Sequence, residues 1–96
     1  MKPSVALANH QNAIRNIVLA HRAGNPRVFG SVASGDDHDG SDIDILVDPA
    51  PDMTLLDLGA IRYELRALLG VDVDVLTPKS LPLKFRQRVL SEAVPV

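Results

Sequence analysis

Two short segments alternate aliphatic and acidic residues, and this alternation constrains the fold more than any other feature of the sequence. Residues 42–47 read DIDILV, and residues 71–77 read VDVDVLT. Side chains two positions apart in a β-strand point to the same face of the sheet. We therefore expect the aliphatic side chains to pack against helices. Four aspartates then share the opposite face: Asp42, Asp44, Asp72 and Asp74.

The other segments predict an α/β domain around these two strands. Apolar residues at helical spacing predict helices over residues 5–22, 54–70 and 83–94, and residues 27–30 form a further short strand. The order helix, strand, Gly/Ser-rich segment, strand, helix, strand, helix indicates helices packed on a small sheet.

The predicted helix ends carry capping residues. Ser4 is the expected N-cap of the first helix, Thr54 and Asp57 form a capping box, and Gly70 ends the central helix. The central helix is expected to bury one apolar stripe, made of Leu55, Leu58, Ile61, Leu65, Leu68 and Leu69.

Length and composition limit what such a chain can do. Ninety-six residues fit one compact domain, so residues 1–96 are expected to form a single unit without a separate substrate-binding domain. The absence of cysteine excludes thiolate metal ligands, and the net charge of −2 argues against binding to DNA or RNA. Polar residues interrupt the N-terminal apolar residues, so we expect neither a signal peptide nor a membrane span, and a cytoplasmic location.

The spacing of Asp42 and Asp44 favours a cation site. Carboxylates at i and i+2 of a strand lie about 7 Å apart at their Cα atoms and point the same way. Unpaired, they repel each other, and a hard divalent cation keeps both ionised. A third carboxylate, from Asp74 or Asp72, would complete a site for two Mg²⁺ ions about 4 Å apart, the arrangement used for in-line phosphoryl displacement.

Gly30 and Ser31 directly follow the first predicted strand and suit a polyphosphate. Glycine lets the backbone approach a ligand closely, and the Ser31 hydroxyl and nearby N–H groups donate to phosphate oxygens. Gly35 allows the next segment to turn tightly over the phosphates.

These residues resemble the DNA polymerase β-type nucleotidyltransferase superfamily. Gly30-Ser31, ten intervening residues and Asp42-Ile43-Asp44 match its GS-x10-D-x-D signature. The short chain, with GSVASGD, SDIDILVD and VDVLTP, is specifically similar to the minimal nucleotidyltransferases, which are antitoxin partners of HEPN-domain toxins. The resemblance covers most of the chain and implies a polymerase β-like palm fold with a small mixed sheet.

The resemblance also implies a function and a role for each motif residue. Some family members transfer AMP from ATP to a tyrosine of the cognate HEPN ribonuclease and thereby silence it, as a type VII-like antitoxin does. Gly30 and Ser31 would bind the triphosphate, and Asp42, Asp44 and Asp74 would bind two Mg²⁺ ions. Asp74 is preferred over Asp72 because the family pattern places this aspartate directly before VxTP, whereas the sheet face alone leaves both open.

Two other functions remain open for the same residues. The chain would act as a binding module if it neutralised a HEPN toxin by occlusion alone, with a vestigial nucleotide site. It would act as a small-molecule nucleotidyltransferase if a partner chain supplied the acceptor pocket. A calcium loop of the EF-hand type is excluded, because the required first aspartate and last glutamate are missing around Gly40.

Several other polar residues are expected to have no role in the site. Asp36, Asp37 and Asp39 are expected to be solvated loop residues. His10 and His21 are expected at the edge of the core or against a partner, too far apart to share a metal, and His38 on the surface. Arg62 and Arg66, one turn apart, are expected on a solvated helix face, where they are available to an acidic partner.

Overall fold

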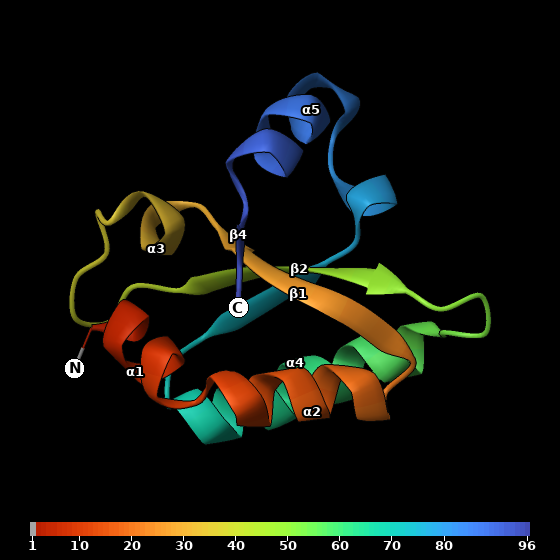
Figure 1. Ribbon diagram of the computed structural model, residues 1–96, viewed down its shortest axis with the longest axis horizontal. Helices are drawn as coiled ribbons and strands as arrows, with labels where there is room; N and C mark the ends of the chain where they lie inside the picture. Colours follow the sequence, from red (N-terminus) through yellow and green to blue (C-terminus); the bar gives the residue numbers. More distant parts are fainter. Residues whose placement is uncertain (1) are drawn as a thin grey trace.

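The computed structural model describes residues 2–96, and a four-stranded mixed sheet forms its centre (Figure 1). The strand order across the sheet is β3-β2-β1-β4. β1 runs antiparallel to both β2 and β4, and β2 runs parallel to β3. The strands span Ala23–Phe29 (β1), Ile43–Pro49 (β2), Val73–Leu76 (β3) and Val94–Pro95 (β4). The expected α/β fold with a small mixed sheet is confirmed.

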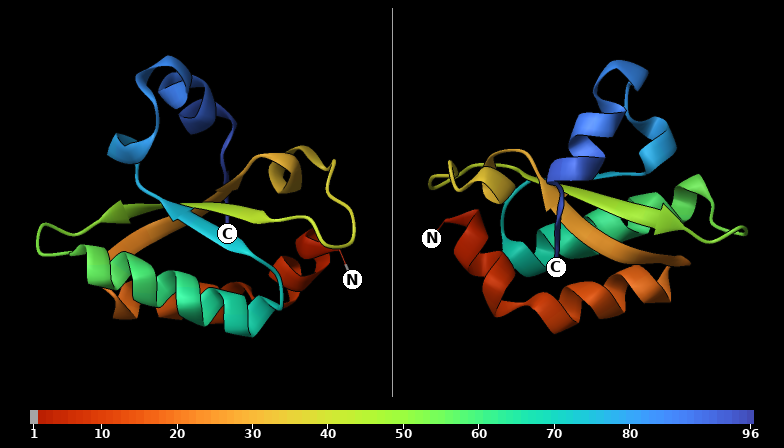
Figure 2. Two further views of the ribbon diagram at one scale, coloured as in Figure 1. Left: turned by 180° about the vertical axis from the view of Figure 1, so that it is seen from behind. Right: turned by 45° about the horizontal axis from the view of Figure 1, so that its top comes forward.

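Two helices, α2 (Gln11–Ala20) and α4 (Leu55–Leu69), cover one face of the sheet (Figures 1 and 2). The alternating aliphatic residues of β2 and β3 point into this layer, as predicted, whereas Leu46 is buried on the opposite face. Eight of the side chains in this core are fully buried: Ile14, Val18, Ile43, Ile45, Val47, Ile61, Leu65 and Val73. In the described residues, no helix is long and apolar enough to cross a membrane.

The single helix predicted over residues 5–22 is in fact two helices, α1 (Pro3–Asn9) and α2. The break lies at His10, which leaves the helical conformation with φ −129° and ψ 23°. Its backbone N–H donates to the Leu7 carbonyl, and its Nδ1 donates to the Ala6 carbonyl at 2.7 Å. The predicted cap at Ser4 is also wrong, because Lys2 is the N-cap and α1 begins at Pro3, two residues before the predicted start, where proline suits the first helical turn.

The central helix α4 has the predicted ends. Thr54 and Asp57 form the capping box, and Gly70 ends the helix in the left-handed conformation at φ +73°. The prediction that Leu55 is buried is wrong, because its side chain is 84% exposed. It lies in the first turn, and the helix enters the core only from Leu58 onward.

The strands differ from their predicted bounds mainly at β1. The prediction began this strand at Arg27, whereas the pairing with β2 begins at Ala23 and passes through an irregularity between Gly24 and Arg27. Asn25 has a positive φ of 49° there, so residues 23–26, which lie between the predicted helix and the predicted strand, form a bulged strand start.

The C-terminal segment crosses the other face of the sheet. After β3, the 3-10 turn η1 (Pro78–Ser80) leads into α5 (Leu83–Glu92), which ends two residues earlier than predicted. β4 then pairs with β1 at the opposite edge, a strand the sequence did not predict. Figure 2 shows α5 on the side of the sheet away from α2 and α4.

Candidate active site

The parallel pairing of β2 and β3 places two of the predicted site aspartates side by side. Asp44 is the direct register partner of Asp74, and neighbouring strands are about 4.8 Å apart. Asp42 lies one residue before β2 and is exposed. The flanking Ile43 and Ile45 are fully buried against the helices, so the alternation directs Asp44 to the opposite face.

The site has an excess of negative charge. Asp44 is half-buried, and burial raises the pKa of its carboxyl group, with further increases from the neighbouring charges of Asp74 and Asp42. None of the ion pairs formed within residues 2–96 involves these three aspartates. A group of like charges without a basic partner is an arrangement that a bound cation stabilises.

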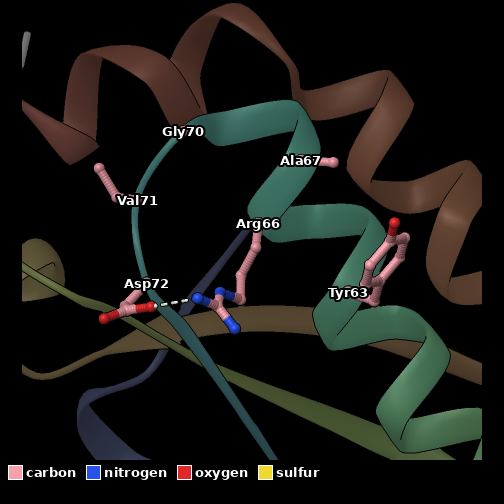
Figure 3. A pocket seen from close by; sticks show the side chains of 6 residues that line it. All are labelled: Tyr63, Arg66, Ala67, Gly70, Val71 and Asp72. Atoms are coloured by element: carbon pink, nitrogen blue, oxygen red, sulfur yellow. Dashed lines mark ion pairs between the residues drawn. The ribbon is translucent and has the colours of Figure 1, made fainter.

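Asp72 has a different environment from Asp74. Its carboxylate forms an ion pair with Arg66 of α4 at 3.0 Å, and its carbonyl accepts from the Ile43 N–H. Figure 3 shows Asp72 and Arg66 together at a hollow of about 590 Å³ beside α4. The expectation that Asp72 lies in the strand and joins the other three aspartates is therefore wrong, because β3 begins only at Val73 and Asp72 is paired with α4. Asp74 is the register partner of Asp44.

Gly30 lies directly against the Asp44 carboxylate. It ends β1 with φ +73° and ψ −149°, and the residue before it, Phe29, is the register partner of Asp44. A Cβ atom at residue 30 would lie 2.6 Å from Asp44 Oδ2, which is closer than real Cβ contacts. Both the backbone conformation and the space require glycine here, so the predicted phosphate-binding backbone adjoins the predicted metal-binding carboxylates.

Ser31 begins the short helix α3 (Ser31–Ser34) and is half-buried. The turn is closed by the Ser34 N–H, which donates to the Gly30 carbonyl at 3.1 Å. Gly35 follows in the left-handed conformation at φ +80°, as its predicted role in a tight turn requires. The Gly30-Ser31 segment is therefore held in one closed turn beside β2.

Two hollows meet at Gly30, with volumes of about 600 and 250 Å³. Their combined size suits a small organic ligand. Both are also lined by Arg88 and Glu92 of α5, which the sequence analysis did not select. No local signal in the sequence pointed to them, because β4 was not predicted and only the crossover from β3 to β4 brings α5 over this face.

The carboxylates fit a metal that binds together with its substrate. Within residues 2–96, no three carboxylate or imidazole side chains are close enough to form a complete metal cage. Mg²⁺ is usually held by one or two carboxylates together with waters and substrate phosphates. Asp42 and Asp44 beside Gly30 supply the protein part of such a ligand set.

Most of the other polar residues considered from the sequence lie away from this site. The prediction that Asp37 is solvated is wrong. Asp37 is buried, and its carboxylate accepts a hydrogen bond from the Ser4 N–H at 2.9 Å. His21 is paired with Glu64, and His38 is exposed. Arg62, like Arg66, bonds to the β3 segment, since its Nε donates to the Val73 carbonyl at 3.0 Å.

The sheet order, the glycine turn and the aligned aspartates define a nucleotidyltransferase. The chain belongs to the nucleotidyltransferase domain family, whose model matches residues 14–96. A relative from Methanocaldococcus jannaschii, named as a candidate protein adenylyltransferase, is 44% identical over 80 residues, which cover 83% of this chain and 86% of the relative.

Solved structures agree with this assignment. A candidate minimal nucleotidyltransferase matches with a TM-score of 0.87 and 38% identity, over 100% of this chain and 97% of that chain. A toxin–antitoxin crystallised with AMP-PNP matches with a TM-score of 0.74 and 25% identity, over 88% of this chain and 70% of that chain. This chain is accordingly an enzyme of the nucleotidyltransferase class.

Proposed function

We propose that this chain transfers AMP from ATP to a tyrosine hydroxyl of a HEPN-domain ribonuclease toxin and acts as its antitoxin. The observation that carries the proposal is the contact between Gly30 and the Asp44 carboxylate, which itself lies beside Asp74. The turn that would bind phosphate therefore adjoins the carboxylates that would bind a cation. The name of the M. jannaschii relative supports an adenylyl group as the group transferred, and the name of the AMP-PNP complex supports a toxin as the partner.

Gly30 and Ser31 would hold the triphosphate. The Asp44 carboxylate fills the space that a Cβ at residue 30 would need, so the triphosphate would be bound by the backbone N–H groups of the turn and by the Ser31 hydroxyl. Because Gly30 lies against Asp44, a triphosphate held by this turn would lie beside the strand carboxylates. The side chains of β2 and β3 thus orient the reacting phosphate.

Asp42, Asp44 and Asp74 would hold two Mg²⁺ ions. Bound Mg²⁺ would neutralise phosphate charge and polarise the phosphate oxygens. The tyrosine oxygen forms a bond to the α-phosphorus as the bond to the α,β-bridging oxygen breaks. Pyrophosphate leaves with that electron pair, and the product is a tyrosine–AMP phosphodiester. The exposed Asp74 carboxylate accepts the proton of the hydroxyl.

The test is incubation of this chain with ATP labelled at the α-phosphate, Mg²⁺ and the HEPN protein encoded beside it. We expect label on the toxin with the wild-type chain and no label with Asp42→Asn/Asp44→Asn. The matched control is Asp39→Asn/Asp52→Asn, which makes the same charge change at two exposed carboxylates that line neither hollow and retains transfer.

Each contrary result identifies a different function. An unlabelled toxin, with nucleotide demonstrably bound to the wild-type chain, overturns adenylyl transfer to the toxin. Full neutralisation of the toxin in cells by Asp42→Asn/Asp44→Asn would establish an antitoxin that acts by binding alone. Label recovered on a small-molecule acceptor would establish a small-molecule nucleotidyltransferase.

A further inference from the structure

The topology forces α5 across the face of the sheet that carries Asp44. β3 and β4 lie at opposite edges of the sheet, and α2 and α4 occupy the other face (Figures 1 and 2). The connection from β3 to β4 therefore passes over β2 and β1 on the aspartate face. Leu46, which shares that face with Asp44, is fully buried, and η1 lies against β2.

The crossover is held together internally and is anchored to the rest of the chain at its end. Within it, the Arg86 guanidinium of α5 donates to the carbonyls of Lys79 and Leu81, at 3.0 and 3.1 Å. At its end, the Val96 N–H donates to the Pro26 carbonyl, and the Arg15 guanidinium donates to the Val96 carbonyl. α5 is thus held above the site although none of its own residues is fully buried.

Arg88 is the cationic residue that α5 presents to Gly30. It lines both hollows that meet at Gly30, and it is the only lysine or arginine lining them among residues 2–96. Its ion pair is with Glu92, one helical turn away at 3.3 Å, and both side chains are largely exposed. Exposed pairs of this kind are weak, so the guanidinium can exchange Glu92 for a phosphate at little cost.

The smaller hollow has an aromatic lining. The chain has only two phenylalanines, Phe29 and Phe85, and both line this hollow together with Val89. Phe85 is 49% exposed although it is a large apolar side chain. Flat apolar surfaces beside a phosphate-binding backbone suit the ring of a nucleobase.

We propose that α5 forms the second wall of the nucleotide cleft, with Arg88 binding the phosphates and Phe29 and Phe85 contacting the base. The inference rests on the proposed function, because it concerns the nucleotide bound at Gly30. It explains how an acidic segment with six aspartates and no lysine or arginine, residues 29–48, accepts an anionic substrate. Arg88 supplies positive charge from outside that segment.

The test measures equilibrium binding of Mg²⁺·ATP, tripolyphosphate and adenosine to this chain in the absence of any toxin. We expect Arg88→Ala to weaken binding of ATP and tripolyphosphate at least tenfold and to leave adenosine binding unchanged. We expect Phe85→Ala to weaken binding of ATP and adenosine at least fivefold and to leave tripolyphosphate binding unchanged.

Two control variants match these changes. Arg22→Ala removes an arginine whose ion pair with Asp52 is also exposed, away from the cleft. Leu83→Ala truncates an apolar side chain of α5 that is 80% exposed and lines neither hollow. Both are expected to bind all three ligands as the wild-type chain does.

The outcomes separate this inference from the proposed function. Wild-type affinity for ATP in Arg88→Ala or Phe85→Ala would overturn the α5 wall and leave adenylyl transfer standing. Failure of the wild-type chain to bind ATP at all would overturn both. An equal loss in Arg22→Ala would show that only the net charge matters and would also overturn the role of Arg88.

Discussion

The Asp44 carboxylate occupies the space that a side chain on Gly30 would need, with Oδ2 2.6 Å from the position of the missing Cβ. Gly30 directly follows β1 and Asp44 lies in β2, and the antiparallel register of these strands brings the two residues together, since Phe29 pairs with Asp44. The turn proposed to bind phosphate and the carboxylate cluster are therefore in direct contact, and a change at Gly30 alters both.

Gly30→Ala should damage the fold and the site together. The added methyl collides with the Asp44 carboxylate, and alanine disfavours φ +73°, so we expect a loss of about 1–3 kcal/mol in unfolding free energy. Chemical denaturation measures this loss, and ATP binding should fall with it. Gly24→Ala is the control, since a Cβ there meets nothing within 4 Å. Equal stability of the two variants would contradict the contact.

Asp44→Asn should stabilise the ligand-free protein while abolishing transfer. Burial and the charges of Asp74 and Asp42 raise the folded-state pKa of Asp44 above the ordinary value of 3.8. Protonation of Asp44 therefore stabilises the folded chain relative to the unfolded chain. This stabilisation is fully present below pH 3.8 and is lost as the pH rises through the raised pKa. At neutral pH the variant should melt a few degrees higher than wild type.

Thermal melts from pH 3 to pH 7 test this prediction. The gap between Asp44→Asn and wild type should open as the pH rises through the Asp44 pKa, and Mg²⁺·ATP should raise the melting temperature of wild type alone. A gap of the opposite sign at neutral pH would show that the charged carboxylate is already stabilised without a ligand.

Asp74→Asn and Asp72→Asn should differ sharply in activity. Asp74 is aligned with Asp44, whereas Asp72 is paired with Arg66. We expect a loss of at least a hundredfold in AMP transfer for Asp74→Asn. For Asp72→Asn we expect near wild-type transfer, with a stability change below about 1 kcal/mol because the Arg66 pair is exposed. Initial rates decide between them, and the reverse order would assign the third carboxylate to Asp72.

The local pattern of the sequence predicted most of the fold. Period-two alternation identified β2 and β3, and the capping box and Gly70 identified α4, because these signals lie within a few neighbouring residues. The break at His10 and the strand β4 were missed. The strand β4 depends on contacts between distant segments, such as the pairing of Val94 with Val28, which no local pattern records. At His10 the apolar periodicity continues from α1 into α2, so the pattern did not mark the local bonds to Leu7 and Ala6 that break the helix.

The candidate site follows the same division. The motif selected Gly30, Ser31, Asp42 and Asp44, but the sheet face could not separate Asp74 from Asp72, since both alternate with valines. The difference arises from Arg66, one helix away, which pairs with Asp72. Arg88 was not selected because only the crossover brings α5 to Gly30.

Asp37→Ala should loosen α1 without affecting the chemistry. The buried carboxylate accepts from the Ser4 N–H in the first turn of α1, and this bond lowers the pKa of Asp37 below 3.8. Because this pKa is lowered, the charged Asp37 carboxylate stabilises the folded chain. This stabilisation is present above pH 3.8 and is lost as the pH falls through the folded-state pKa. We expect the variant to melt a few degrees lower at pH 7 and to match wild type in strong acid.

Amide hydrogen exchange should be faster in residues 3–9, while AMP transfer persists. Asp36→Ala, at an exposed neighbouring carboxylate, should leave α1 exchange unchanged. Equal exchange in both variants would show that Asp37 does not hold the helix start.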